Sequence, residues 1–202
     1  MRDVLSWRLF VALAVPDHVR EELTRAQRGL REALPTGIRW TPPEQFHLTL
    51  KFLGDVPADS VMRLENALHH AVEILPAGQL HSGGLGVFPD LRRPRVIWAG
   101  VTGAGNQLAV QHKAVQQACA EFSNEPAENE FAGHITLGRV KKPNRALGEA
   151  IGRAVKMEER TVFGTWTARS VDLMRSELSE SGAKHLIQAS FRLFGALTDR
   201  DE

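Results

Sequence analysis

Hydrophobic positions along the first half of the chain alternate between the two-residue period of strands and the period of about 3.6 residues of helices. Residues 7–15 alternate as a strand does, and the next segment, Pro16 to Ala33, carries apolar residues at helical spacing. Further strands are predicted over residues 38–41, 46–53, 80–88 and 95–101, and a helix over residues 57–75. In the strand at 46–53 we expect one side to carry Phe46, Leu48, Leu50 and Phe52.

The second half repeats this alternation. The pattern predicts helices over residues 106–122 and 143–156, and strands over residues 133–140, 161–174 (one or two) and 184–193. The polar residues 123–130 indicate a loop, and Ser181-Gly182 indicates a turn. Nothing between the halves has the composition of a flexible linker. We therefore expect residues 1–202 to form a single domain of the α/β class, α+β type, in which the two halves pack together.

Two segments share one pattern. His47-Leu48-Thr49-Leu50 is followed by the end of its predicted strand, a proline and a helix, and His134-Ile135-Thr136-Leu137 repeats this order almost half a chain later. Either copy alone is a weak motif, but two copies arise by chance in only about one of several thousand chains of this composition. Duplication of one strand-then-helix unit would produce this arrangement, with each copy forming one wall of a shared cleft.

Strand geometry places the polar residues of each segment together. Residues two apart in a strand share a face, so His47 and Thr49 face one side while Leu48 and Leu50 face the core. The second segment repeats this, and two such strands would present two imidazoles and two hydroxyls to one phosphate-sized space. Cleavage of a phosphodiester needs a proton acceptor and a proton donor on opposite sides of phosphorus, and two histidines can fill both roles near neutral pH.

Two other interpretations of these histidines compete with this one. A single histidine on a strand is usually an ordinary, partly buried residue, although the paired motif weakens that interpretation. A metal site is the other rival, because histidine is a common zinc ligand. His-x-Thr is not a ligand pair with a familiar metal-binding spacing, so we expect metal-independent catalysis without any cofactor. The remaining histidines, among them His69, His70, His112 and His185, show no catalytic pattern.

Composition and charge restrict the setting rather than the activity. Hydrophobic residues make up 43 % of the chain, enough for a core without disulfides, and the single Cys119 is expected to be a small buried residue. No segment approaches the length of a membrane span, which predicts a soluble, cytoplasmic protein. The net charge of +1 does not indicate nucleic-acid binding by the whole surface. RNA would have to be held by local cations such as Arg139, Lys141, Lys142 and the Arg92–Arg95 turn, although that turn is more typical of a solvated loop.

The paired segments resemble those of the two-histidine (2H) phosphoesterase superfamily, and within it the RNA 2′,3′-cyclic phosphodiesterases, also called the 2′-5′ RNA ligase family. The likeness extends over most of the chain. It includes Arg8-Leu9-Phe10-Val11-Ala12 before a proline-initiated helix, Trp40-Thr41 ahead of the first motif, Phe88-Pro89, Arg95-Val96-Ile97-Trp98, and the arginine that trails the second motif in Gly138-Arg139. One departure is Gly133, where many members have proline.

This resemblance implies a bilobal fold of two pseudo-symmetric, intertwined lobes. Each lobe would be an antiparallel sheet flanked by helices and would carry one His-x-Thr motif, with the active-site cleft between the lobes. His47 would be the proton donor to the leaving 3′-oxygen, and His134 would be the proton acceptor that activates water, giving a 2′-phosphate. Thr49, Thr136 and Arg139 would bind the phosphate. Arg139 is out of phase with the alternating face, so a bulge near Gly138 is needed to turn it inward.

The expected substrate is RNA with a 2′,3′-cyclic phosphate end, or a cyclic nucleotide, with no obligate protein partner. Two alternatives stay open in the sequence. A ribose 5′-hydroxyl could replace water, which would make the reaction a 2′-5′ ligation by the same chemistry. A non-catalytic module could recognise RNA ends or nucleotides without turnover, although keeping two titratable groups argues against that. The sequence does not separate hydrolysis from ligation.

Overall fold

The computed structural model describes residues 5–123, 125, 131–179 and 182–195. The strands are β1 (Ser6–Ala14), β2 (Ile38–Trp40), β3 (His47–Pro57), β4 (Gly78–Phe88), β5 (Val96–Gly103), β6 (His134–Val140), β7 (Val162–Ala168), β8 (Ser170–Ser179) and β9 (Gly182–Arg192). The α-helices are α1 (Asp17–Ala33), α2 (Val61–Val72), α3 (Gln107–Ala118) and α4 (Arg145–Met157), and short 3-10 turns cover Pro43–Gln45, Ala58–Ser60 and Ala120–Phe122.

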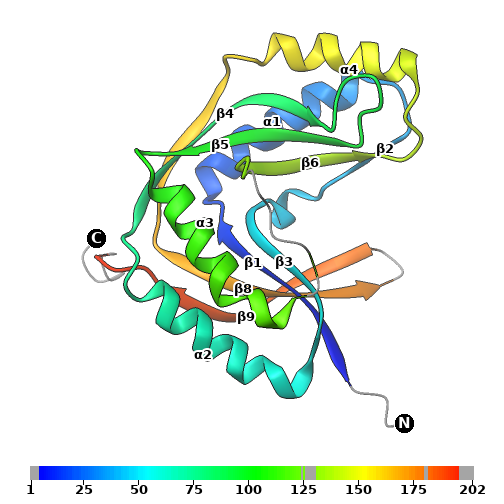
Figure 1. Ribbon diagram of the computed structural model, residues 1–202. Coiled ribbons are helices and arrows are strands. Elements are labelled where there is room, and N and C mark those ends of the chain that lie inside the picture. The colour runs from blue at the N-terminus through cyan, green and yellow to red at the C-terminus, as the bar shows by residue number, and fades with distance from the viewer. Residues whose placement is uncertain (1–4, 124, 126–130, 180–181, 196–202) are drawn as a thin grey trace.

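The strands named above form one antiparallel sheet, and its two halves belong to different lobes. The order is β7-β4-β5-β6-β3-β1-β8-β9, with β2 added beside β6. β4, β5, β6 and β7 make the upper lobe with α1 and α4, and β1, β3, β8 and β9 make the lower lobe with α2 and α3 (Figure 1). This arrangement confirms the α+β class and the two lobes with antiparallel strands and flanking helices.

The two central strands, β3 and β6, are the ones that begin with the motif histidines. They pair at a single register position, Leu48 opposite Ile135. Both side chains have no exposed surface, and burying a residue of this size contributes about 1.5–3 kcal/mol. The upper and lower lobes therefore meet at a hydrophobic contact next to the two motifs.

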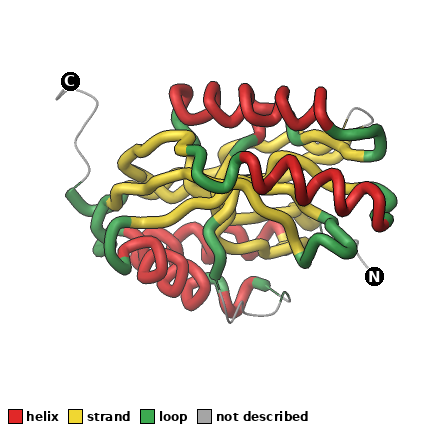
Figure 2. Tube along the Cα trace, turned by 90° about the horizontal axis from the view of Figure 1, so that it is seen from above, coloured by secondary structure: helices red, strands yellow, loops and turns green. Residues whose placement is uncertain are grey.

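The helices cover the sheet from outside, as the tube view shows with strands between helices (Figure 2). α1 turns Val19, Leu23 and Leu30 into the core. Its buried Gln27 donates hydrogen bonds to the carbonyl oxygens of Thr41 (2.7 Å) and Leu137 (2.8 Å). These two residues lie just beyond the last register pair of β2 and β6, so the bonds satisfy backbone groups at the end of that pairing. None of the described helices is both long enough and apolar enough to cross a membrane.

The predicted elements are confirmed, with shifted boundaries. The helix expected from residue 57 begins at Val61, because β3 continues to Pro57 and a 3-10 turn follows. The segment at 161–174 forms two strands, and the strand expected over 7–15 is β1. The predicted loop at 123–130 and the turn at Ser181-Gly182 fall partly outside the described residues.

One prediction about side-chain direction is wrong. Phe46, Leu48 and Leu50 are buried as expected, but Phe52 is 47 % exposed. The reason is a register skip between β1 and β3: Val11 pairs with Lys51 and Ala12 with Thr49, so Leu50 is an extra residue in β3. An extra residue reverses the alternation, which turns Phe52 to the face that carries His47.

The glycine-rich stretch of β4 is a strand to which other chain segments approach closely. Gly84 has a φ of 65° and donates its N–H to the carbonyl oxygen of Thr161 at 2.8 Å. Gly86 lies under the ring of Trp98, and a Cβ there would come within 2.2 Å of that ring. Because Trp98 lies beside His134, with ring centroids 6.4 Å apart, the packing at Gly86 reaches the second motif.

We expect Gly86→Ala to lower the free energy of unfolding by about 1–3 kcal/mol, the usual cost of overpacking a well-filled site. The matched control is Gly29→Ala in α1, where a Cβ would meet nothing within 4 Å and alanine should stabilise the helix by about 0.5–1 kcal/mol. Urea unfolding of both variants measures the difference, and a Gly86→Ala protein as stable as the control would contradict the close packing of Gly86 under Trp98.

Candidate active site

The first residues of β3 and the first residues of β6 bring the two motifs together. Antiparallel register around the Leu48–Ile135 pair directs His47 toward Thr136 and Thr49 toward His134. The four polar side chains are partly exposed, whereas the apolar residues between them are buried. The structure thus places both imidazoles and both hydroxyls on one face of the sheet where the lobes meet.

Each imidazole is held by a backbone carbonyl two residues earlier in the chain. Nδ1 of His47 lies 2.7 Å from the oxygen of Gln45, and Nδ1 of His134 lies 2.8 Å from the oxygen of Ala132. A carbonyl oxygen can only accept, so Nδ1 of each ring carries the proton and donates it. This fixes the tautomer and leaves Nε2 of each histidine as the atom that can take up or release a proton.

Aromatic rings pack against both histidines. The centroid of Phe10 on β1 is 4.8 Å from that of His47, and the centroid of Phe88 on β4 is 4.9 Å from that of His134. Trp98 of β5 lies behind Phe88, at 5.0 Å. These contacts restrict the orientation of each imidazole and exclude water from one side of it.

A register skip follows each motif at the same position. In β6, Gly138 pairs with Ile97 and Thr136 with Trp98, so Leu137 is the extra residue, as Leu50 is in β3. The bulge that Arg139 requires is therefore present, and it returns this exposed side chain to the face of His134 and Thr136. Phe52 is the counterpart of Arg139 in the first motif, a position that unbroken alternation would have assigned to the core.

His47 is neutral over a wide pH range in the free protein. Burial is the main reason that its pKa is lowered from 6.5 to about 4, and the neighbouring positive charges of His185, His134 and Arg139 act in the same direction. The hydrogen bond to Gln45 acts in the opposite direction but is outweighed.

His185 of β9 is a further residue at the site, and the sequence did not indicate it. Its ring stands edge-on to His47 with centroids 5.5 Å apart, and it also contacts Phe10 at 5.0 Å. Its buried Nδ1 has no hydrogen-bond partner, and burial lowers its pKa. No local motif could have revealed this neighbour, because only the pairing of β1, β8 and β9 brings it to the site.

Three further histidines and the cysteine lie away from the motif residues. His69 and His70 are exposed on α2 near Glu73, at 3.5 and 3.4 Å, and His112 is buried in α3 against Phe131. Cys119 is buried, as predicted, and burial raises the pKa of its thiol to about 12, which makes it a poor nucleophile. Within the described part of the chain, no three His, Cys, Asp or Glu side chains cluster as metal ligands.

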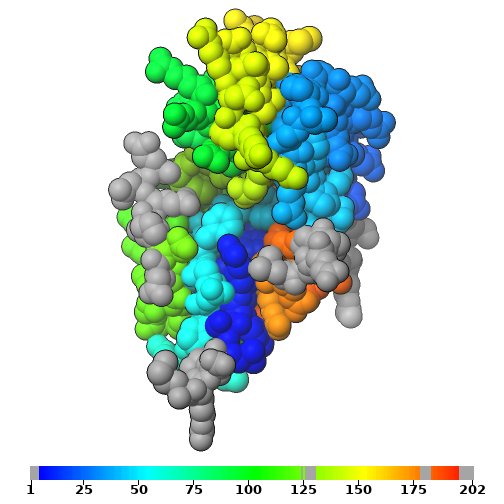
Figure 3. All heavy atoms as spheres, turned by 90° about the vertical axis from the view of Figure 1, so that its right-hand side faces the viewer, coloured from blue at the N-terminus to red at the C-terminus, as the bar shows by residue number. Residues whose placement is uncertain are grey.

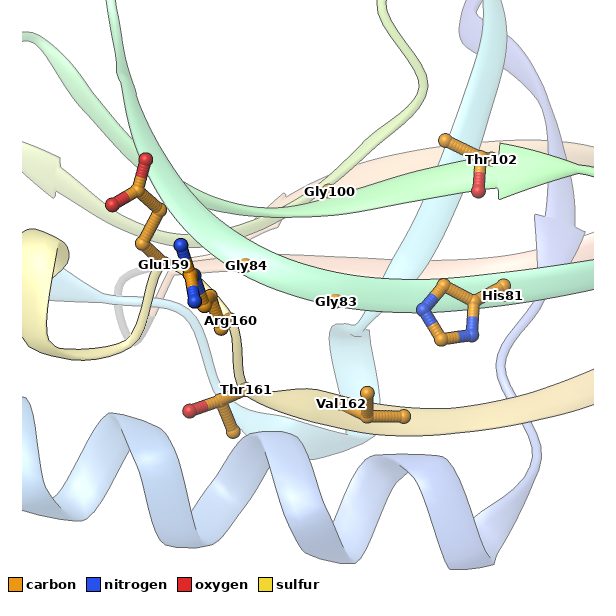
Figure 4. Close-up of a pocket in the computed structure, with 9 residues that line it drawn as sticks. All are labelled: His81, Gly83, Gly84, Gly100, Thr102, Glu159, Arg160, Thr161 and Val162. Atoms are coloured by element: carbon orange, nitrogen blue, oxygen red, sulfur yellow. The ribbon is translucent and has the colours of Figure 1, made fainter.

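A shallow cavity of about 250 Å³ adjoins the second motif (Figure 4). Gly83, Gly84 and Gly100 form its floor, and Gly100 is the cross-strand partner of His134. His81 and Thr102 lie at one end, and the turn after α4, from Glu159 to Thr161, lies at the other. Gly100 needs to be glycine for a structural reason, since a Cβ there would come within 2.8 Å of the oxygen of Gly83.

Comparison with known proteins identifies the family. Residues 13–98 match the family model described as LigT-like phosphoesterase. An RNA 2′,3′-cyclic phosphodiesterase of Methanothermobacter thermautotrophicus is 31 % identical over 188 residues, covering 92 % of this chain and 98 % of the relative. The chain belongs to the LigT-like phosphoesterases. A second relative of the same name, from Aquifex aeolicus, is 30 % identical over 93 % of this chain and 98 % of its own.

Solved structures of LigT-like proteins share the fold. A crystal structure of a Thermus thermophilus protein superposes with a TM-score of 0.75 at 26 % identity, covering 93 % of this chain and 98 % of that one. Escherichia coli LigT in complex with 3′-AMP gives a TM-score of 0.74 at 21 % identity, covering 94 % and 99 %. Gly133, which the resemblance to the family marked as a departure, precedes the second motif. A Cβ at Gly133 would come within 2.5 Å of the oxygen of Val101, so the residue is closely packed here.

The lowered pKa of His47 predicts a pH-dependent stability. The unfolded chain binds a proton at His47 below about pH 6.5, and the folded protein binds it only below about 4. The titration of His47 therefore leaves the free energy of unfolding unchanged above pH 6.5. As the pH falls to about 4, it lowers that free energy by up to about 3 kcal/mol. His47→Gln should remove this part of the acid destabilisation, measured by urea unfolding at a series of pH values. The exposed His70→Gln is the control, and identical pH dependence in both variants would contradict the burial of His47.

Proposed function

We propose that the protein hydrolyses RNA 2′,3′-cyclic phosphate ends to 2′-phosphate ends by two-histidine acid–base catalysis. The observation that carries the proposal is the matched geometry of the two motifs. Both histidines donate Nδ1–H to a carbonyl oxygen two residues back, and both leave Nε2 free at the junction of the lobes. Two imidazoles prepared in the same way on opposing strands suit the two proton transfers of phosphodiester cleavage.

In the proposed reaction the two imidazoles act on opposite sides of phosphorus. Nε2 of His134 accepts a proton from the attacking water as the new P–O bond forms. Nε2–H of His47 donates a proton to the 3′-oxygen as the P–O3′ bond breaks. The phosphate stays on the 2′-oxygen, and the two histidines end in the opposite protonation states, which exchange with solvent restores.

The remaining motif residues bind the charged group. The hydroxyls of Thr49 and Thr136 donate hydrogen bonds to the non-bridging oxygens, and the Arg139 guanidinium offsets the negative charge of the phosphate. Phe52, at the corresponding position of the other motif, offers an exposed ring on which the terminal base can stack. The names of the relatives from M. thermautotrophicus and A. aeolicus support the substrate class, and the 3′-AMP complex of E. coli LigT supports nucleotide binding on this fold.

The low pKa of His47 limits when it can act as a donor. In the free protein His47 is neutral at neutral pH, so it has to gain its proton with or after the substrate. An anionic phosphate beside Nε2 favours the charged imidazole and raises its pKa. Substrate binding and proton uptake are therefore coupled in this proposal.

We expect His47→Ala and His134→Ala each to lower turnover of a nucleoside 2′,3′-cyclic phosphate roughly 10²–10⁴-fold, the usual contribution of a positioned acid or base. The double variant should lose far less than the product of the two, because both groups serve one transition state. His70→Ala is a control. A folded His134→Ala protein with full activity would refute the proposed site.

The same variants test which histidine donates. In His134→Ala the residual rate should fall as the pH rises through the pKa of His47, because the remaining histidine has to be protonated to act as the donor. In His47→Ala the residual rate should rise with pH, because His134 has to be neutral. Opposite slopes would show that the two roles are reversed, an assignment that the bell-shaped profile of the wild type cannot make.

Removal of metal ions tests the acid–base mechanism from another side. We expect activity to be unchanged after exhaustive chelation with EDTA and gel filtration, because the proposed proton transfers and phosphate contacts use side chains alone. The control is a chelated sample to which zinc or manganese is added back. Activity that disappears with EDTA and returns with either ion would overturn the proposed mechanism.

A further inference from the structure

Two arginines stand directly opposite each other beside the motif strands. In the pairing of β2 with β6, Arg39 is the partner of Arg139. Their neighbours Ile38 and Trp40 point the other way, since a Cβ on Gly138 would lie within 3.0 Å of both side chains. Arg39 and Arg139 are therefore exposed on the face that the second bulge turns toward the motif histidines.

A third cation continues the row. The Lys141 N–H donates to the oxygen of Gly37 at 2.9 Å, which extends the β2–β6 pairing by one residue and carries Lys141 to the same side as Arg139. We call Arg39, Arg139 and Lys141 together the cationic strip. No ion pair joins any of the three to a carboxylate among residues 5–123, 125, 131–179 and 182–195.

The strip is a cost to the folded protein unless an anion binds there. Like charges directly opposite each other in an antiparallel pair destabilise it, by roughly 0.2–1 kcal/mol. Three arginines of α1, by contrast, have a compensating contact: Arg20 bonds Asp17, Arg25 bonds Glu22, and Arg31 lies over the ring of Trp40. An unpaired row of cations next to a phosphate site is suited to a second phosphate of the same polymer.

The position of the strip agrees with this. Arg139 follows Thr136 by three residues, about 10 Å of extended chain shortened by the bulge. Figure 3 shows the face on which β3 (cyan), the segment between β6 and α4 (yellow-green) and the segment around β2 (light blue) come together. An RNA chain whose end occupies the motif site therefore has the cationic strip within reach.

We propose that Arg39, with Lys141, binds the first phosphodiester on the 5′ side of the terminal nucleoside, and so gives the enzyme a preference for RNA chains over cyclic mononucleotides. The proposal rests on the proposed function, because it assumes that the cyclic phosphate lies between His47 and His134. Arg139 binds the cyclic phosphate, and Arg39 binds the neighbouring phosphodiester on the 5′ side. Arg39 is a specificity residue: it touches neither the reacting phosphorus nor the histidines.

The test compares two substrates that share one reacting end. One is a nucleoside 2′,3′-cyclic phosphate with a free 5′-hydroxyl, and the other is a trinucleotide that ends in the same nucleoside cyclic phosphate. For Arg39→Gln we expect kcat/KM to fall about 10-fold on the trinucleotide, the order of one charge-assisted hydrogen bond, and less than about 2-fold on the mononucleotide. The slope of log KM against log salt for the trinucleotide should become shallower by about 0.7–1.

Two variants serve as controls. Arg28→Gln removes the same charge from an exposed position of α1 and should change neither substrate. Arg39→Lys keeps the charge, so it should retain the salt dependence while losing part of the affinity that a planar guanidinium provides. Thermal unfolding of Arg39→Gln shows whether the strand has been disturbed.

Each outcome has a distinct meaning. If wild type turns over neither substrate, the proposed function fails, and the inference that rests on it fails with it. If wild type is active and Arg39→Gln lowers both substrates equally, Arg39 acts on the cyclic phosphate or on the fold, and the inference is wrong. If Arg39→Gln changes kcat/KM for neither substrate, or only as much as Arg28→Gln does, the cationic strip is a solvated surface and the inference is wrong as well.

Discussion

The contact between Leu48 and Ile135 is the point on which the rest of the structure depends. It is the single register pair between β3 and β6, and through it the two lobes become one sheet. Each of these residues stands between the histidine and the threonine of its own motif. Burial of the apolar residue therefore fixes the two polar neighbours on the opposite face, because alternation in a strand allows no other arrangement. The hydrophobic core and the candidate site are built by the same few residues.

Hydrogen bonds to backbone carbonyls complete the orientation of the two histidines that core packing begins. Packing sets the position of each histidine, but the carbonyls of Gln45 and Ala132 set which nitrogen is available. Burial of His47 then keeps it neutral in the free protein, with a pKa of about 4. The site is thus prepared for an anion, whose charge would reverse the balance that burial imposes. Burial of His47 favours its neutral form in the free protein, whereas the proposed catalysis requires its protonated form.

The two motifs are equivalent in backbone and different in side chain. Each strand gains an extra residue at the leucine that ends the motif, Leu50 in one and Leu137 in the other. The bulge then presents an aromatic ring, Phe52, from one lobe and a cation, Arg139, from the other. A nucleotide has both a flat base and a charged phosphate, so the same bulged strand, present twice, can contact two different parts of one substrate. Arg39 adds a second charge opposite Arg139, whereas the residue opposite Phe52 is Phe10 of β1.

The sequence alone determined the alternation of strands and helices, the repeated motif and the residues that face away from the core within it. These follow from local periodicity, which each segment carries in itself. It also required a bulge near Gly138, because Arg139 would otherwise face the wrong side. The matching skip at Leu50 had no such signal, and Phe52 was therefore assigned to the core. Tertiary structure decided that His185 lies against His47 and that Arg39 lies opposite Arg139. Both depend on which strands pair and in which register, and pairing between distant segments is set by packing of the whole core rather than by any local pattern.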